Sequence, residues 1–210
     1  MQIIDIQAAK QHFAATDPVM AQLLDNALSA PRPMLLPKQR VASEYFSSIV
    51  ASIISQQIST KAADAVRRRV LTHLGGTITP EAVLRADFDA LKHCGLSNQK
   101  TKYIKHNAEA WPTIAINKFV GMGNDAVIME LTKLYGIGRW TAEMFLIFSL
   151  ARPDVFSYGD LGLMKGLYLA YNYKPHYVRK IETTVDNWSP HQTVAALALW
   201  FSLDNGPVLL

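Results

Sequence analysis

The stretch at residues 131–142 constrains the fold of this chain more than any other. Its apolar residues recur at helical spacing, and Gly136 and Gly138 flank Ile137. A helix must stop and reverse at this point, because glycine turns freely through positive φ. A second helix starts at once, and the backbone N–H groups of residues 138–142 lack helical partners there, with the positive end of the helix dipole behind them. The stretch therefore indicates a phosphate-binding helix start, although an ordinary tight turn between helices has the same glycine spacing.

Length and composition favour a folded, soluble, intracellular protein. The 210 residues suffice for one full core or for two helical lobes that share a cleft. No apolar run approaches the roughly 18 residues of a membrane span, and the N-terminus, with Asp5 and Gln7, lacks the pattern of a signal peptide. The single cysteine, Cys94, excludes an internal disulfide and any cysteine-ligated iron–sulfur or zinc cluster. The formal net charge of +4 favours an anionic partner, a description that nucleic acid fits.

Helical spacing continues through almost all of the chain, and strand-like alternation is confined to scraps near Ile3. The predicted fold is all-α. Residues 1–40 supply a helix and a proline-bearing connector that belong to the helical core, and residues 41–210 form a single compact unit of two lobes. Two short helices are expected after Pro80 and after Asp87. The other predicted helices cover residues 18–28, 43–54, 59–74, 97–111, 125–135, 139–150, 160–171, 177–187 and 190–203.

Five motifs occur along the chain in a fixed order. They are Ser55–Ser59 with Lys61–Ala63, Gly95–Ser97 with Gln99 and Lys100, Leu134–Ala142, Asp154–Phe156 with Gly159 and Asp160, and Trp188–Pro190 with Ala195 and Trp200. Together they resemble the helix-hairpin-helix DNA glycosylase superfamily and, within it, the 3-methyladenine DNA glycosylase II family. The resemblance covers about residues 40 to 204 and implies that family's fold, two helical lobes around a cleft. It also implies an enzyme that flips alkylated purines such as 3-methyladenine or 7-methylguanine out of duplex DNA and hydrolyses the N-glycosidic bond.

Asp160 matches the catalytic aspartate of that family. The departing base leaves an oxocarbenium-like sugar, and a nearby carboxylate stabilises the positive charge that develops in the transition state. From its position alone, Asp160 is better explained as the N-cap of the helix that follows it. The two roles are compatible.

Trp140 decides the chemical subclass that the resemblance implies. Superfamily members that also cut the DNA strand carry a lysine at this place in the hairpin, and its amine attacks the sugar to form a Schiff base. An indole cannot do this, so we expect a monofunctional hydrolase without lyase activity. Those relatives often hold a cysteine-ligated cluster, which one cysteine cannot supply. No cofactor is therefore expected to be required.

The resemblance places Trp140 and Trp200 in the base pocket, and Tyr158 is added as a candidate because it lies close to Asp160 in the sequence. Alkylation at N3 of adenine or N7 of guanine puts a positive charge on the base. A cation over an aromatic face gains roughly 0.5 to 2 kcal/mol. Core packing is the alternative role for Trp200.

Gln57 falls where the family places a side chain that fills the gap left by the flipped nucleotide. A glutamine there could also hydrogen-bond the orphaned partner base, and the alternative role is a solvent-facing turn residue. The other predicted DNA contacts lie in the same motifs: Gln56, Ser59, Ser97, Lys100, Gly136, Gly138, Arg139 and Thr141.

The hairpin of this family often holds a monovalent cation through backbone carbonyls. The resemblance transfers that site, for Na⁺ or K⁺, to the carbonyls of Thr132, Leu134 and Ile137. The sequence departs from some relatives at Gly159, where they have a second acidic residue, and at Leu161, where they have tyrosine. These departures leave the range of lesions open.

The expected partner is double-stranded DNA that contains damaged bases, bound by a monomer and without a membrane. The expected location is the cytoplasmic nucleoid in a bacterium and the nucleus in a eukaryote. A competing hypothesis is a non-catalytic helix-hairpin-helix DNA-binding module. Asp160 argues against it, since a carboxylate near phosphates is unfavourable unless it serves chemistry. Trp140 argues against a third reading, an oxidised-base glycosylase with lyase activity.

Overall fold

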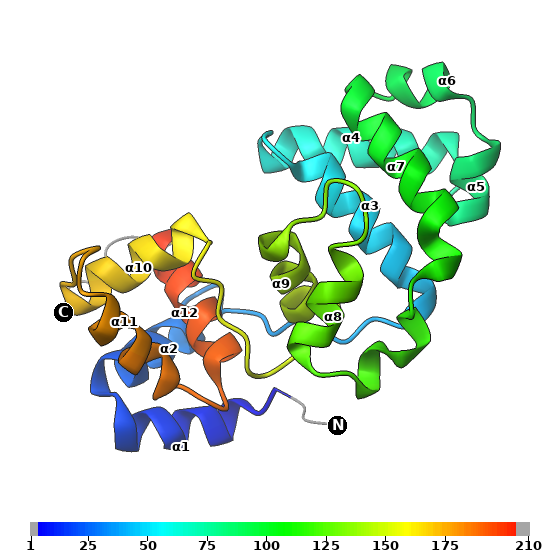
Figure 1. The fold of residues 1–210 in the computed structure, drawn as a ribbon. Coiled ribbons are helices and arrows are strands. Elements are labelled where there is room, and N and C mark those ends of the chain that lie inside the picture. The colour runs from blue at the N-terminus through cyan, green and yellow to red at the C-terminus, as the bar shows by residue number, and fades with distance from the viewer. Residues whose placement is uncertain (1–3, 205–210) are drawn as a thin grey trace. The chain divides into compact units, whose positions relative to one another are not determined.

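The computed structural model describes residues 4–204, which contain helices and no β-strand (Figure 1), so the predicted all-α fold class is confirmed. The chain divides into two compact units. Unit 1 combines the N-terminal residues up to Lys38 with the chain from Leu146 onward, and unit 2 is Gln39–Phe145. Helix α9 (Arg139–Phe148) begins in unit 2 and ends in unit 1.

Unit 1 is built from α1 (Ile6–Thr16), α2 (Pro18–Ser29), α10 (Leu161–Tyr171), α11 (Val178–Asp186) and α12 (Gln192–Asp204). Helix α1 was not predicted, and Ile3, where strand-like scraps were noted, lies outside the described residues. The helix forms because Asp5 caps it through the N–H groups of Gln7 and Ala8, and because Ala9 and Phe13 face the core at helical spacing. The cap and the burial of these two residues together stabilise a helix whose amphipathic pattern is weak.

The core of unit 1 joins both ends of the chain. Buried Phe13, Met20 and Leu24 of the N-terminal helices belong to one hydrophobic cluster with Trp188 and Leu199 from the C-terminal part. Burying a side chain of this size contributes roughly 1.5–3 kcal/mol. The N-terminal helices are thus part of the helical core.

Asp17 ties these elements together. It caps α2 by accepting the Met20 N–H at 3.0 Å through Oδ1, and its Oδ2 accepts the Tyr171 hydroxyl at 2.7 Å and the Trp188 indole N–H at 2.8 Å. The carboxylate is 8% exposed, so each bond forms away from water. Burial of Tyr171 is the main cause that raises its pKa far above the usual range, and the hydrogen bond to Asp17 and the negative charge of that carboxylate add to the rise.

Unit 2 is a bundle of short helices around α3 (Tyr45–Ser55). The short helices after Pro80 and Asp87 form as predicted, and Ser59, Thr79, Asp87 and Ser97 each cap the helix that follows them. The 3-10 helices η1 (Ala42–Glu44), η2 (Trp111–Thr113) and η3 (Ile116–Gly121) flank or connect the α-helices, and η3 was not predicted. The remaining helices are α4 (Thr60–His73), α5 (Pro80–Arg85), α6 (Phe88–His93), α7 (Asn98–Ala110) and α8 (Asn124–Leu131).

Basic side chains of unit 2 bind the carbonyls at helix C-termini. Arg69 donates from Nε to the Cys94 carbonyl at 2.7 Å, after α6. Lys105 donates to the carbonyls of Leu84 and Ala86, at the end of α5. These cations neutralise the negative ends of helix dipoles. Part of the basic charge read from the sequence therefore acts within the protein.

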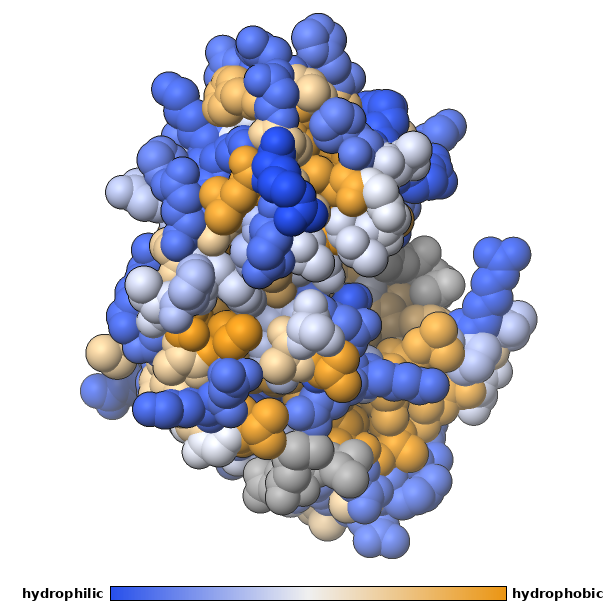
Figure 2. Space-filling view, turned by 90° about the vertical axis from the view of Figure 1, so that its right-hand side faces the viewer, coloured by the Kyte–Doolittle hydropathy of each residue, from blue (hydrophilic) through white to orange (hydrophobic). Residues whose placement is uncertain are grey.

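On the face shown in Figure 2, hydrophilic side chains project outward and hydrophobic residues lie between them in small patches. Within residues 4–204, no helix combines the length and the apolar character that crossing a membrane would require.

We predict that Asp17→Ala lowers the free energy of unfolding by about 3 kcal/mol, because it removes a cap and leaves the Tyr171 hydroxyl and the Trp188 indole N–H without an acceptor. Asp5→Ala is the matched control. It removes an exposed cap at the start of α1 and should cost about 1 kcal/mol. Urea denaturation of both variants measures the difference, and equal losses would show that the two buried donors matter little.

Candidate functional site

The predicted hairpin exists in unit 2, between α8 and α9, but its glycines play different parts. Helix α8 ends at Leu131, earlier than predicted, and turns fill residues 132–136. Gly136 has φ of +75°, and a Cβ added there would lie 2.4 Å from a ring carbon of Tyr103. Gly138 has no positive φ and open space around it, so the prediction that both glycines serve the reversal is wrong for Gly138.

One of the backbone N–H groups predicted to bind phosphate at the start of α9 already has a hydrogen-bond partner within the helix. The Ala142 N–H donates to the Gly138 carbonyl at 3.0 Å and so does not belong to the phosphate-binding set. Thr141 is buried, so its side chain is not exposed for the predicted contact with DNA. Arg139 is held by Glu143, with Nε to Oε1 at 2.8 Å, and lies 3.6 Å from Asp125. Its charge is thus balanced by carboxylates within the protein.

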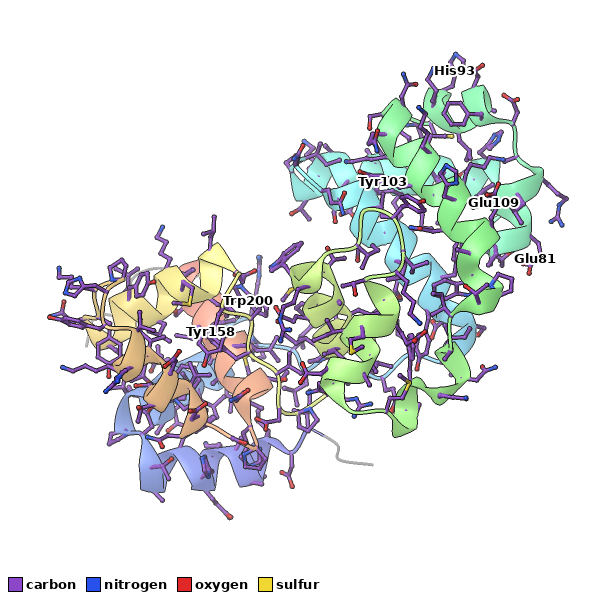
Figure 3. All side chains as sticks on the ribbon, in the orientation of Figure 1. Glu81, His93, Tyr103, Glu109, Tyr158 and Trp200 are labelled. Carbon is purple, nitrogen blue, oxygen red and sulfur yellow. The ribbon has the colours of Figure 1, made fainter. Side chains whose placement is uncertain are left out.

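Asn107 was missed at the sequence level. Its side chain on α7 is fully buried and grips the hairpin backbone: Oδ1 accepts the Tyr135 N–H at 2.7 Å, and Nδ2 donates to the Tyr135 carbonyl at 2.9 Å. Tyr103, labelled in Figure 3, packs against Gly136 from the same helix. The available signal was an amide residue in line with the buried positions Thr101 and Ile104.

The turn after α3 carries Gln56 and Gln57. Gln56 donates from Nε2 to the Gly136 carbonyl at 2.8 Å, so its amide contacts the hairpin. Gln57 is exposed and has φ of +57°, a conformation that costs a non-glycine residue about 1–2 kcal/mol. Ser59 accepts the Ala62 N–H, and Ser97 accepts the Lys100 N–H, so both predicted DNA contacts serve as helix caps.

Lys100 was predicted to contact DNA, and its ammonium group lies instead on backbone carbonyls. Nζ donates to Ile54 and to Gln56, both at 2.7 Å. Burial lowers the pKa of this lysine. The side chain therefore binds the C-terminal end of α3.

The hairpin carbonyls divide into two sets. Those of Tyr135 and Gly136 accept side-chain amides, from Asn107 and Gln56. Leu134 accepts the Ile137 N–H at the long distance of 3.3 Å. The predicted ligands of a monovalent cation, the carbonyls of Thr132, Leu134 and Ile137, are of the oxygen type that hard cations prefer. That site stays a prediction.

In unit 1, Asp160 fulfils its predicted role as N-cap of α10, accepting the Leu163 N–H at 2.8 Å through Oδ1. The same oxygen accepts the Trp200 indole N–H at 3.1 Å. Trp200, on α12, also stacks on Phe148, with ring centroids 5.7 Å apart and an interplanar angle of 29°. The carboxylate is thus largely buried, with one oxygen held by two donors.

Gly162 is a second residue that sequence reasoning missed. A Cβ at this position would lie 3.1 Å from Asp160 Oδ1 and 3.2 Å from Trp200 Nε1. Both contacts are tighter than ordinary packing, so the absence of a side chain lets the indole reach the carboxylate. A glycine inside a helix costs about 1 kcal/mol relative to alanine, which was the available signal.

The loop before Asp160 is fixed by the start of α12. Thr193 donates from its hydroxyl to the Arg152 carbonyl at 2.6 Å and accepts the Val155 N–H at 3.2 Å. Asp154 accepts the Ser189 hydroxyl at 2.7 Å. These bonds hold in place the loop at residues 152–159, which has no helical hydrogen bonds of its own.

Tyr158 lies in this loop with its ring against Phe156, at a centroid distance of 5.1 Å (Figure 3). Burial raises the pKa of Tyr158 to about 12, and the charges of Asp186 and Glu182 on α11 add to the rise. The hydroxyl therefore stays protonated and able to donate at neutral pH. Trp140, in unit 2, is 44% exposed, which leaves part of its ring accessible.

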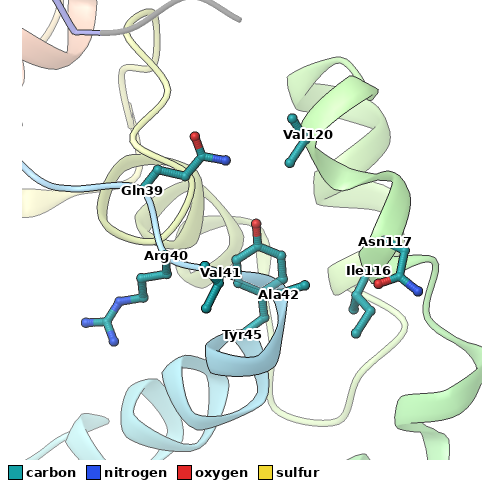
Figure 4. Close-up of a pocket in the computed structure, with 8 residues that line it drawn as sticks. All are labelled: Gln39, Arg40, Val41, Ala42, Tyr45, Ile116, Asn117 and Val120. Carbon is teal, nitrogen blue, oxygen red and sulfur yellow. The ribbon is translucent and has the colours of Figure 1, made fainter.

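A cavity of about 370 Å³ in unit 2 is separate from these residues (Figure 4). None of the predicted site residues lines it. Its lining consists of Gln39, Arg40, Val41, Ala42, Tyr45, Ile116, Asn117 and Val120.

Residues 50–191 match the family described as HhH-GPD superfamily base excision DNA repair protein. The chain belongs to this family. The matched span contains the hairpin, the Gln56–Gln57 turn and Asp160 of this HhH-GPD protein, whereas Trp200 lies beyond it.

Relatives with curated names support the assignment. DNA-3-methyladenine glycosylase 1 of Schizosaccharomyces pombe is 35% identical to this HhH-GPD protein over 75% of this chain and 72% of that one. The crystal structure of a DNA-3-methyladenine glycosidase from Bacillus halodurans aligns with a TM-score of 0.80 and 34% identity, over 94% of this chain and 89% of that chain. A Schizosaccharomyces pombe 3-methyladenine DNA glycosylase in complex with abasic DNA aligns with a TM-score of 0.76 and 29% identity, over 94% and 97%.

We predict that the two hairpin glycines differ in what they tolerate. Gly136→Ala should lower the free energy of unfolding by at least about 2 kcal/mol, because it combines a strained φ with overlap on Tyr103. Gly138→Ala should cost less than about 1 kcal/mol, since its Cβ meets open space at a helix start. Urea denaturation compares them. Equal losses would contradict the assignment of the reversal to Gly136.

Proposed function

We propose that this protein is a monofunctional DNA glycosylase that removes alkylated purines of the 3-methyladenine or 7-methylguanine type from duplex DNA. The observation that carries the proposal is the arrangement at Asp160, a largely buried carboxylate held at one oxygen by a backbone N–H and an indole N–H. Membership of the HhH-GPD family and the 3-methyladenine glycosylase relatives support the same activity.

Asp160 supplies a fixed negative charge for the transition state. As the N-glycosidic bond breaks, positive charge develops on the sugar, and a carboxylate that is already oriented stabilises it without reorganisation. Trp200 keeps the carboxylate oriented through its N–H. Water then adds to the sugar, and the product is an abasic site.

Selection of the base is proposed to depend on aromatic side chains of the protein that contact it and on how readily the alkylated base leaves the sugar. Trp200, stacked on Phe148, and Tyr158 in unit 1 are the proposed contacts for the cationic base. A cation over such a face gains about 0.5–2 kcal/mol, and more as water is excluded. Alkylation also weakens the glycosidic bond, so the pocket can be permissive.

DNA is proposed to bind through the hairpin at the start of α9 and through Gln57. The backbone N–H groups of the hairpin and the helix dipole attract a phosphate, and the exposed Gln57 fills the gap left by the flipped base. A monovalent cation on the carbonyls of Thr132, Leu134 and Ile137 would add positive charge beside that phosphate. No other cofactor is proposed, and the protein is proposed to act as a monomer.

Asp160→Asn is expected to separate chemistry from capping. Asparagine caps a helix about as well as aspartate, so the free energy of unfolding should change by well under about 1 kcal/mol. Base release should fall by orders of magnitude, each factor of ten corresponding to about 1.4 kcal/mol. Thermal melting, duplex binding and release of a methylated purine are measured on one preparation. Near-normal release, on a stable substrate as well as a labile one, would favour the non-catalytic binding module.

The DNA strand should remain uncut, because the indole of Trp140 offers no amine for a Schiff base. Incubation with alkylated duplex and borohydride should give no covalent protein–DNA adduct. Breakage at the abasic product should appear only after alkali treatment. The Trp140→Lys variant, tested beside the native protein, shows whether an amine at this position can be trapped. An adduct with the native protein would contradict the monofunctional assignment.

A further inference from the structure

The turn that follows α3 is held by hydrogen bonds from the side chains of Lys100 and Gln56. Lys100 reaches from α7 to the carbonyls of Ile54 and Gln56, both at 2.7 Å, and Gln56 reaches to the Gly136 carbonyl at 2.8 Å. These bonds form a continuous path from α7 through the turn to the hairpin. Each ends on a backbone carbonyl, so it fixes main chain rather than another side chain.

Gln57 is the residue of this turn whose backbone conformation most needs support from its surroundings. The residue after a helix C-cap is commonly glycine, because the chain there turns through positive φ. Gln57 adopts that φ as a non-glycine residue, and its side chain is exposed. Such strain persists where the surroundings over-determine the backbone. The carbonyl that immediately precedes Gln57 is one of the two that Lys100 binds.

Helix α7 also fixes the hairpin. Tyr103 packs against Gly136, and Asn107 makes both of its hydrogen bonds to the Tyr135 backbone. Lys100, Tyr103 and Asn107 recur at i, i+3 and i+7, which places them along one helical face. One face of one helix therefore sets the position of the turn relative to the hairpin.

We propose that Lys100 is a positioning residue, which holds the Gln57 turn beside the hairpin, and that it does not neutralise a DNA phosphate. The inference rests on the proposed function, in which the turn and the hairpin touch the same duplex. A turn that is loosely placed fills the gap of a flipped nucleotide poorly, so the flipped complex is less populated and base release slows. Binding to phosphates, which the hairpin provides, should change little.

Lys100→Met tests this, with Lys102→Met as the matched control. Lys102 lies on the same helix, carries the same charge and is exposed. At saturating protein, release of a methylated purine should fall on the order of tenfold or more in Lys100→Met, as expected for misplacement of a group that acts on the substrate. It should stay within about twofold of the native rate in Lys102→Met, and Lys100→Arg, which keeps the donors, should recover most of the rate.

The salt dependence of duplex affinity distinguishes positioning from phosphate contact. The log–log slope should be unchanged in Lys100→Met. A slope smaller by about 0.9, with saturated release intact, would mean the loss of one phosphate contact and would overturn the proposal. Native-like release in Lys100→Met, or equal losses in Lys100→Met and Lys102→Met, would overturn it as well.

Two further measurements keep the test independent of folding and of the proposed function. If Lys100→Met does not fold, Gln56→Leu, which cuts the same path at the hairpin, should show the same slow release at an unchanged salt slope. Amide hydrogen exchange at residues 55–58, measured without DNA, should speed up in Lys100→Met and stay native-like in Lys102→Met. A native protein that releases no base would contradict the proposed function. The hydrogen-exchange result would still support or refute the proposal that Lys100 holds the Gln57 turn in position.

Discussion

Helix ends govern this structure, because each one leaves backbone N–H or C=O groups that need a partner. The described chain consists of short helices, so such ends are frequent. Asp17 shows how much depends on meeting that need: one carboxylate caps α2 and binds Tyr171 and Trp188 from the other end of the chain. The proposed catalytic residue obeys the same rule. Asp160 is held in position as the cap of α10.

The same requirement explains the positions of several basic side chains. Arg69, Lys100 and Lys105 bind carbonyls at helix C-termini, and Arg139 pairs with Glu143. These four cations therefore have partners within the protein. We propose that the hairpin attracts a phosphate by other means, through oriented backbone N–H groups and a helix dipole that carry no net charge. A modest net charge of +4 is compatible with that mode of binding.

The parts of the structure that the sequence predicted are those fixed by neighbours in the chain. Caps such as Ser59, Ser97 and Asp160 act on the N–H three residues ahead, so their signal is local. The apolar periodicity of residues 43–54 predicts α3 from local sequence in the same way. Helix α1 was not predicted because its apolar residues are sparse. The core that buries its Phe13 includes residues from the other end of the chain, such as Trp188.

The parts of the site that could not be predicted depend on contacts across the fold. Asn107 binds a residue 28 positions away, and Lys100 reaches residues more than 40 positions before it. Nothing in the neighbouring sequence distinguishes Lys100 from Lys102, yet one ammonium is partly buried on carbonyls and the other is exposed.

Gly162 completes this pattern. Its lack of a side chain has meaning only because Trp200, 38 positions later in the sequence, passes within 3.2 Å of where a Cβ would stand. A larger residue would push the indole away from Asp160 and weaken the bond that orients the carboxylate. The shape of the proposed catalytic site thus depends on a missing atom as much as on the residues that carry its chemistry. Only the folded chain shows which glycine has this role.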